Sequence, residues 1–268
     1  MNALINSIWG NNLFSPGHLL YLDGFSKLEN CKKIVTVQDM SIENIKKLEK
    51  YYDHIEIIKS SFSGYSLDYA QLKYFEKNAS DFEYVLFTDS FDVVLQSDPF
   101  DFISQFSEDL FFTSPGFKMK EQWPDRTWHE YFNKTLEFPE NFHEDRVLNG
   151  GFRIGKVNAF LDFYVFLISN ENRNGRHVVN QTVFNYYYHL MRDRGTIRIF
   201  DSRLDHFAYH CQNERFFDRE ENPLVIDGEI YFTPEQKYCV WHQYEDIGYS
   251  TVLDKDGKPY IIKSSAKK

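Results

Sequence analysis

The chain has 268 residues, 42% of them hydrophobic and 26% charged, and its formal net charge at pH 7 is -10. These proportions are ordinary for a globular protein and allow one substantial hydrophobic core. The acidic balance and the absence of a Lys/Arg block argue against nucleic acid or an anionic membrane as a partner.

Aromatic residues are abundant, with 26 Phe and 18 Tyr. Most are expected in the core, and some are candidates for platforms under sugar rings or a nucleobase. Cys31, Cys211 and Cys239 form no C-x-x-C pair and are expected to be free thiols in a reducing compartment. We see no signal peptide and no apolar run near the roughly 20 residues of a membrane span. We therefore expect a cytoplasmic protein without a transmembrane segment.

Strand and helix signals alternate through the first half of the chain. Strands are predicted at 3–9, 32–37, 54–59 and 84–88, and helices at 18–28, 42–52 and 68–77. Ser41 supplies an N-cap for the second of these helices, in which Ile45, Leu48 and Tyr52 recur at helical spacing. This alternation predicts an α/β fold with a mostly parallel or mixed central sheet and helices on both faces.

The second half of the chain is a mixture of shorter signals. Strands are predicted at 110–113, 151–154, 198–201 and 238–242, helices at 157–169 and 178–191, and a loop at 214–224. No internal repeat or low-complexity linker divides the sequence. We therefore expect a single domain over residues 1–268.

The most informative stretch is Tyr84-Val-Leu-Phe-Thr-Asp-Ser-Phe-Asp-Val-Val-Leu-Gln-Ser-Asp-Pro-Phe100. Asp89 directly follows an apolar strand, and Asp92 comes three residues later. Ligands of parallel α/β sheets bind at the carboxyl ends of the strands. Two carboxylates this close repel each other, and a divalent cation such as Mn²⁺ or Mg²⁺ relieves the repulsion. The alternative is that Asp89 caps a turn or the following helix.

This segment resembles the metal-binding segment of GT-A fold glycosyltransferases whose acidic motif is Asp-x-x-Asp. The likeness is to the glycosyltransferase domain of lysyl hydroxylases and to related bacterial glycosyltransferases with a Thr-Asp-x-x-Asp-Val pattern, and it extends loosely over most of the chain. It implies a Rossmann-like GT-A domain. In such a domain residues 1–110 form the nucleotide-sugar-binding half, and 111–268 form the acceptor-side half with a C-terminal metal-ligand segment.

A second point of likeness is Val147-Leu-Asn-Gly-Gly-Phe-Arg-Ile-Gly155. It is similar to the Asn-x-Gly element of retaining GT-A enzymes, where the backbone comes close to the donor sugar, an approach that glycine permits because it lacks Cβ. The resemblance implies donor-binding roles for Asn149, Gly150 and Gly151, and for Phe91 beside the uracil. The alternatives are a tight turn at Asn149 and core packing for Phe91.

A third point of likeness is Val178-Val-Asn-Gln-Thr-Val-Phe-Asn185. It resembles the Asp-Gln pair that opens a helix beside the anomeric carbon in the same enzymes, and it implies catalytic positions for Asn180 and Gln181. The chain departs from the family pattern because the acid is replaced by Asn180. Asparagine can orient a group or hydrogen-bond to it, but it is neither a base nor an anionic nucleophile. An ordinary N-cap is the alternative for Asn180.

The segment Tyr238-Cys-Val-Trp-His-Gln-Tyr244 brings a histidine to the end of a strand near the C-terminus. The resemblance implies that His242 completes the metal shell with Asp89 and Asp92, a ligand set that suits Mn²⁺. His206 and His210 lie in another aromatic stretch and compete for this assignment, and a structural role for His242 is the other alternative. Candidates to meet phosphate or acceptor charge, with a surface position as the alternative, are Arg126, Arg146, Arg153 and Lys156.

The resemblance implies a metal-dependent hexosyltransferase that moves a sugar from a UDP-sugar to a glycan, a lipid-linked saccharide, a protein or another hydroxyl acceptor, with retention of configuration. A GT-A domain that binds nucleotide-sugar or glycan with little catalysis is the main rival, supported by Asn180. A HAD-type phosphatase is disfavoured because the two acids of its motif are separated by one residue, whereas two residues separate Asp89 from Asp92. A nucleotidyltransferase is disfavoured because Ser15-Pro-Gly17 supplies no basic glycine-rich loop.

Overall fold

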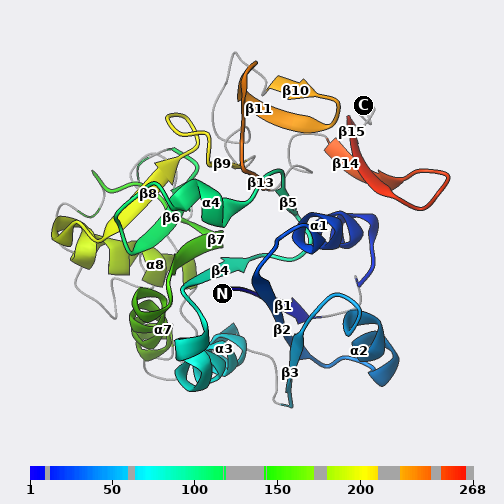
Figure 1. Ribbon diagram of the computed structural model, residues 1–268. Coiled ribbons are helices and arrows are strands. Elements are labelled where there is room, and N and C mark those ends of the chain that lie inside the picture. Colours follow the sequence, from blue (N-terminus) through cyan, green and yellow to red (C-terminus); the bar gives the residue numbers. More distant parts are fainter. Residues whose placement is uncertain are drawn as a thin grey trace.

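A computed structural model describes residues 1–9, 13–59, 64–116, 118, 142, 144–171, 180–210, 224–242 and 249–263. At its centre lies a seven-stranded sheet in the order β3-β2-β1-β4-β7-β6-β8 (Figure 1). Its strands are β1 (Asn2–Trp9), β2 (Cys31–Gln38), β3 (His54–Ile58), β4 (Tyr84–Thr88), β6 (Leu110–Ser114), β7 (Asn149–Lys156) and β8 (Ile197–Asp201).

The central sheet is mixed, because one strand runs against the others. β1, β2, β3 and β4 run parallel to one another, as do β6 and β8. β7 is antiparallel to both β4 and β6 and joins the two parallel groups. The carboxyl end of β4 therefore meets the amino end of β7 at one edge of the sheet. The prediction of a Rossmann-like α/β fold with a mostly parallel or mixed sheet is confirmed.

Helices cover both faces of this sheet (Figure 1). They are α1 (Pro16–Ser26), α2 (Ile42–Leu48), α3 (Gly64–Asn78), α4 (Pro99–Ile103), α7 (Val157–Glu171) and α8 (Asn180–Met191), with short 3₁₀ turns η1 (Ala79–Asp81) and η4 (Arg192–Arg194). Alternating residues of β1 belong to opposite cores, as the two-residue repeat of a strand requires. Ala3 and Ile5 pack with α3, α7 and α8, whereas Leu4 and Ile8 pack with α1, α2 and α4.

Side-chain caps explain where several helices begin. The Ser15 and Ser41 hydroxyls accept the backbone N–H of His18 and Asn44 at the starts of α1 and α2. The N-cap predicted at Ser41 is thus confirmed, but α2 ends at Leu48, earlier than the predicted limit of 52. Tyr52 leaves the helical path because its ring is buried and its hydroxyl accepts a hydrogen bond from Asn6.

A smaller three-stranded sheet adjoins the carboxyl edge of β4. β13 (Val240–His242) pairs antiparallel with β5 (Val93–Leu95) and parallel with β9 (Ala208–His210). Sequence analysis predicted a strand at 238–242, of which β13 forms the last three residues, but it missed β5 and β9. It also missed β10 (Leu224–Ile226), β11 (Glu229–Thr233), β12 (Gln236–Lys237), β14 (Tyr249–Leu253) and β15 (Pro259–Lys263). Of the loop predicted at 214–224, Leu224 instead begins β10, and the remainder lies outside the described residues.

Two further expectations can be compared with the described residues. Cys31 and Cys239 are free thiols, as predicted, and Cys211 lies outside the described part of the chain. No helix among the described residues combines the length and the apolar character that crossing a membrane requires.

Candidate functional site

Asp89 and Asp92 lie in the connection between the central sheet and the smaller sheet. Asp89 is the first residue after β4, and its backbone N–H donates to the carbonyl of Gly151 on β7 at 2.8 Å. Ser90 is buried and its hydroxyl donates to the carbonyl of Ser7 near the end of β1, at 2.9 Å. Asp92 leads directly into β5. Both carboxylates are therefore carried on backbone that is fixed by the strands around it.

His242 reaches these carboxylates through strand pairing. It is the last residue of β13, and the antiparallel ladder places it opposite Val93, the residue that follows Asp92. Its Nε2 lies 3.5 Å from Asp92 Oδ2 and 3.7 Å from Asp89 Oδ2. One ligand atom from each of the three residues lies within 4.8 Å of the others. The three metal ligands expected from the sequence thus form one group, called here the ligand cluster.

The carboxylates and the imidazole of the ligand cluster shift one another's pKa values. Burial lowers the pKa of His242, but the negative charges of Asp92 and Asp89 outweigh burial and raise this pKa to about 9. Burial raises the pKa of Asp92, but attraction to His242 prevails and holds it below its ordinary value. Without a cation, a protonated His242 therefore offsets part of the carboxylate charge. A bound divalent cation would take the place of that proton.

The donor set of the ligand cluster fits a divalent metal. His242 is buried, and its Nε2 has no hydrogen-bond partner among the described residues, because both carboxylates are beyond hydrogen-bond distance. A buried polar atom of this kind calls for an explanation, and a metal ion between it and two carboxylates supplies one. Two oxygen ligands and one imidazole suit Mn²⁺ well, while Mg²⁺ prefers an all-oxygen shell.

Gly151 forms a wall of the ligand cluster in a way that only glycine permits. A Cβ at this position would lie 2.5 Å from Asp89 Oδ2 and 2.6 Å from His242 Cε1. Asn149 is buried, and its side-chain oxygen accepts the Gly151 N–H at 2.8 Å. The structure thus places Asn149, Gly150 and Gly151 in strand β7 beside the ligand cluster, rather than in a turn before the strand. Their contact with a donor sugar stays a prediction.

His210 contacts the His242 ring on the side away from the carboxylates. Sequence analysis gave no reason to assign it this position. It is the last residue of β9 and is paired in register with His242, and their two Nδ1 atoms lie 3.0 Å apart. Burial and the neighbouring His242 hold the pKa of His210 well below its ordinary value. A neutral His210 accepts the Nδ1–H of His242, which directs Nε2 toward the carboxylates. Sequence analysis named His210 only as a competitor for the metal-ligand role of His242, because the strand that carries it was not predicted.

Phe91, Asn180 and Gln181 are the other residues that were predicted to form the site. Phe91 is partly buried, and its ring centre lies 5.0 Å from that of His18 on α1. Asn180 and Gln181 lie in the first turn of α8, as expected, but their side chains are outside the described part of the structure. One turn later, the Asn185 side chain accepts the backbone N–H of Leu148 at 2.9 Å. This bond joins α8 to the segment that enters β7.

The described basic residues that were named as candidates to meet phosphate or acceptor charge contact other groups of the protein. Arg153 is fully buried beneath β7 and is not a surface cation. Lys156 pairs with Asp109 at 2.6 Å, and Arg146 donates to the carbonyl of Gly116 at 2.8 Å. Arg126 lies outside the described residues. The described cations therefore have protein partners that the sequence pattern did not reveal.

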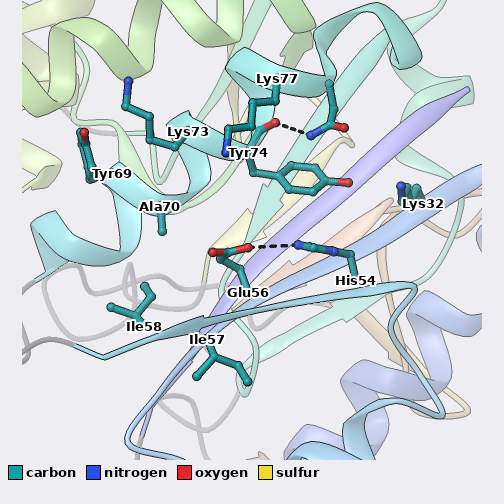
Figure 2. Close-up of a pocket in the computed structure, with 11 residues that line it drawn as sticks. Lys32, His54, Glu56, Ile57, Ile58, Tyr69, Ala70, Lys73, Tyr74 and Lys77 are labelled. Carbon is teal, nitrogen blue, oxygen red and sulfur yellow. Dashed lines mark hydrogen bonds and ion pairs between the residues drawn. The ribbon is translucent and has the colours of Figure 1, made fainter.

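A separate groove of about 710 Å³ lies between the edge strand β3 and helix α3 (Figure 2). Lys32, Lys73 and Lys77 line it together with Tyr69 and Tyr74. Within the groove, the His54 ring packs against the Tyr74 ring, with 4.6 Å between their centres. No residue of the ligand cluster lines this groove, so it is a different surface feature.

Comparison with known proteins gives no independent assignment. No protein-family model matches this sequence, and a search of curated proteins finds no match. The case for a function therefore depends on the chemistry and geometry of the ligand cluster and on the sheet edge that carries it.

Proposed function

We propose that this chain is a metal-dependent glycosyltransferase of the GT-A kind, which transfers a hexose from a UDP-sugar to a hydroxyl acceptor. The observation that carries the proposal is the ligand cluster of Asp89, Asp92 and His242 at the carboxyl edge of a Rossmann-like sheet. This edge is where α/β sheets bind their ligands. The fold by itself does not select a chemistry, so the proposal depends on the site.

The proposed roles follow from the positions of the residues. Asp89, Asp92 and His242 would hold Mn²⁺ or Mg²⁺, whose Lewis acidity would offset the charge of a departing nucleoside diphosphate. Asn149 and the backbone at Gly150–Gly151 are the proposed neighbours of the donor sugar, since the absence of a Cβ at Gly151 lets this strand lie directly against Asp89 and His242. Phe91 is the proposed neighbour of the nucleobase.

The reacting carbon is assigned to the first turn of α8. Gln181 and Asn180 are the proposed neighbours of the anomeric centre, where each can hydrogen-bond but neither can accept a proton as a base. Retention of configuration, with the leaving phosphate taking the acceptor proton, is the mechanism that needs no protein carboxylate at this position. The proposed acceptors are a glycan, a lipid-linked saccharide or a protein side chain. The cytoplasm is the proposed compartment, supported by the free thiols of Cys31 and Cys239.

A GT-A domain that binds nucleotide-sugar or glycan without efficient turnover is the second candidate. Asn180 favours it, because this position carries an amide where the related enzymes carry an acid. The two functions predict the same metal-dependent nucleotide binding. They differ in turnover, so release of UDP from a UDP-sugar separates them.

The deciding experiment is a thermal-shift titration with UDP, GDP and CMP, each with and without Mn²⁺. We expect stabilisation by UDP only when Mn²⁺ is present, because a ligand that binds only the folded state raises its stability. A panel of UDP-sugars is then tested for release of UDP. Binding without release would select the second candidate. The absence of any shift at millimolar nucleotide would remove the enzyme and the nucleotide-sugar-binding form of the second candidate.

A further inference from the structure

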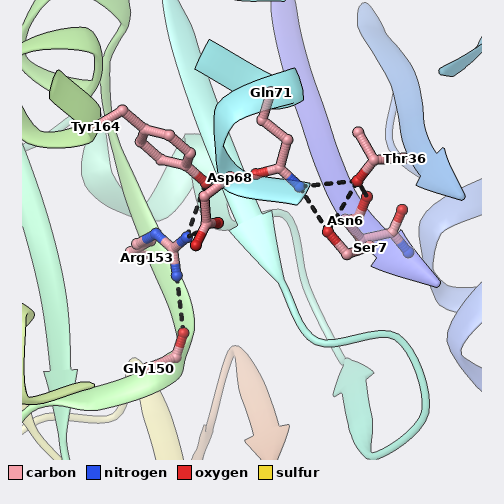
Figure 3. Close-up of polar contacts among 8 residues, drawn as sticks. All are labelled: Asn6, Ser7, Thr36, Asp68, Gln71, Gly150, Arg153 and Tyr164. Carbon is pink, nitrogen blue, oxygen red and sulfur yellow. Dashed lines mark hydrogen bonds and ion pairs between the residues drawn. The ribbon is translucent and has the colours of Figure 1, made fainter. Parts of the chain in front are cut away.

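A buried cation lies directly beneath the glycine pair of the candidate site. Arg153 follows Gly151 by two residues on β7 and has no exposed surface. Its guanidinium donates to the Gly150 carbonyl at 2.9 Å and to the Tyr164 hydroxyl at 2.8 Å (Figure 3). It also stacks on Phe87, at 3.5 Å from the ring centre. The carboxylate of Asp68 is 3.9 Å away. Burying a charged side chain costs free energy, so the buried position of Arg153 needs a structural explanation.

The reason lies in an irregularity of β7. Phe112 of β6 pairs with Arg153, but the next residue, Thr113, pairs with Asn149, so residues 150–152 are skipped and the strand bulges. The peptide between Gly150 and Gly151 therefore lacks ladder partners on the β6 side. Its two polar groups are satisfied by side chains instead: Arg153 donates to its carbonyl, and Asn149 accepts its N–H. Arg153 and Asn149 together hold this peptide in place, and we call the pair the clamp.

The clamp has little tolerance for movement. The Gly151 carbonyl accepts the backbone N–H of Asp89 at 2.8 Å, and Asp89 also approaches within 2.5 Å of the place where a Gly151 Cβ would lie. A small shift of the Gly150–Gly151 peptide would therefore move Asp89 or collide with it. Arg153 touches neither Asp89 nor His242, and its influence has to pass through the backbone.

The other end of the same network reaches the Asp-x-x-Asp turn. The Tyr164 hydroxyl donates to Gln71 Oε1 at 2.6 Å, and Gln71 Nε2 donates to the hydroxyls of Ser7 at 2.7 Å and Thr36 at 3.1 Å (Figure 3). The carbonyl of Ser7 accepts the hydroxyl of Ser90, which stands between the two aspartates. One buried chain of hydrogen bonds thus supports both backbone segments that frame the site.

We propose that Arg153 is a positioning residue for the metal centre, an inference that rests on the proposed metal-binding function. It fixes the Gly150–Gly151 peptide against Asp89 and, through Tyr164 and Gln71, links that peptide to the strand that supports Ser90. Partners that only orient metal ligands change metal affinity by about 10- to 100-fold when they are removed. Arg153 should act within this range although it contacts no ligand side chain.

The test compares two variants with a matched control. Arg153→Lys keeps the charge but cannot donate to Gly150 and Tyr164 in the same fork geometry. Tyr164→Phe removes one hydroxyl and keeps the ring. Tyr187→Phe removes a hydroxyl from the same hydrophobic core, outside this network. Mn²⁺ affinity is measured by calorimetry without nucleotide, and hydrogen–deuterium exchange is measured on metal-free protein.

We expect Arg153→Lys to weaken Mn²⁺ binding by about tenfold, Tyr164→Phe to weaken it less, and Tyr187→Phe to leave it unchanged. Faster exchange should be confined to peptides that cover 148–153 and 88–92. Parent-like affinity and exchange in both network variants would overturn the inference. If Arg153→Lys does not fold, Tyr164→Phe decides. If the parent binds no Mn²⁺, the proposed function fails, and exchange in metal-free protein still decides whether Arg153 positions the two segments.

Discussion

At the scale of single residues, Asp92 is the most direct test of the ligand cluster. It is half-exposed in a turn, and its carboxylate faces His242, so its removal should change the site far more than the fold. We expect Asp92→Ala to abolish Mn²⁺-dependent stabilisation by UDP, a larger loss than the roughly 10- to 100-fold typical of supporting residues. Asp81→Ala, at another exposed aspartate, is the control. Binding of UDP and Mn²⁺ at the parent level in Asp92→Ala would show the metal assignment to be wrong.

Gly151 tests how closely the backbone approaches the metal ligands. Gly151→Ala would place a methyl group against Asp89 and His242, so we expect it to weaken Mn²⁺ binding severely. Gly155→Ala is the matched control on the same strand, where a Cβ would lie 2.7 Å from Leu110 and far along β7 from the ligand cluster. Both variants should lose thermal stability through overpacking, by about 1–3 kcal/mol. Only Gly151→Ala should lose metal affinity, and calorimetry of both variants separates these effects.

His18 should make the folded state sensitive to acid. It is buried, its Nδ1 accepts the Phe14 N–H at 3.1 Å, and burial lowers its pKa to about 4. In the unfolded chain His18 takes up a proton near pH 6.5, whereas in the folded protein it takes up a proton only near pH 4. This contribution to stability is therefore present above pH 6.5 and lost as pH falls toward 4, by up to about 3 kcal/mol.

His18→Gln removes this titration and keeps a hydrogen-bond acceptor. We expect its free energy of unfolding in urea to fall less steeply than that of the parent between neutral pH and pH 4. His54→Gln, at a half-exposed histidine on β3, is the control and should follow the parent. Equal slopes for His18→Gln and the parent would mean that His18 is protonated in the folded protein at mildly acidic pH.

At the scale of elements, Gln96 joins the segment after β5 to the C-terminal strands. Its Nε2 donates to the carbonyls of Ile230 at 2.9 Å and Tyr238 at 2.7 Å, and its Oε1 accepts the Ile230 N–H at 2.7 Å. Gln96→Ala would remove the side-chain partner of the Tyr238 carbonyl and of the Ile230 N–H, while the Ile230 carbonyl would still accept the Tyr238 N–H at 3.1 Å. We expect a loss of about 1–3 kcal/mol in unfolding free energy, with faster hydrogen exchange in β11 and β13. Gln105→Ala, at an exposed glutamine with one side-chain hydrogen bond, should change little.

Element lengths explain how much of the fold could be predicted from sequence. β4 was predicted with the observed bounds because four apolar residues and Thr88 are followed directly by the acidic segment that begins at Asp89. β5 and β9 could not be predicted, because three residues establish no periodicity. The direction of β7 was also hidden, since alternation of hydrophobic residues does not distinguish parallel from antiparallel neighbours.

The metal ligands could be predicted, Asp89 and Asp92 from a local motif and His242 from the family resemblance, but the residues that support them could not. Asp89 and Asp92 lie together in the sequence, whereas His210 acquires its position from pairing between β9 and β13. Arg153 was named as a candidate to meet phosphate or acceptor charge, with a surface position as the alternative, and the structure instead buries it in a hydrogen-bond network. A sequence pattern gives the charge of a side chain, but the packing of α3 and α7 decides which groups it can reach.

At the scale of the whole molecule, the ligand cluster ties the central sheet to the smaller sheet. Asp89 and Asp92 extend from β4, while His242 belongs to β13, far along the chain. A metal ion held by all three would cross-link these two regions. It would also remove the mutual repulsion of the carboxylates, so that occupied protein should be more stable than metal-free protein.

Such a cross-link should be measurable as added stability. We expect Mn²⁺ at 100 times its dissociation constant to stabilise the protein by about 2.7 kcal/mol, and a chelator to reverse the effect. Hydrogen exchange should slow mainly in β5, β9 and β13, because these strands gain the cross-link, whereas β2 and β3 at the far edge of the central sheet should change little. His242→Gln, which removes the ligand from the smaller sheet, should lose both effects. Uniform protection of all strands in the parent, or an unchanged response in His242→Gln, would mean that Mn²⁺ binds elsewhere.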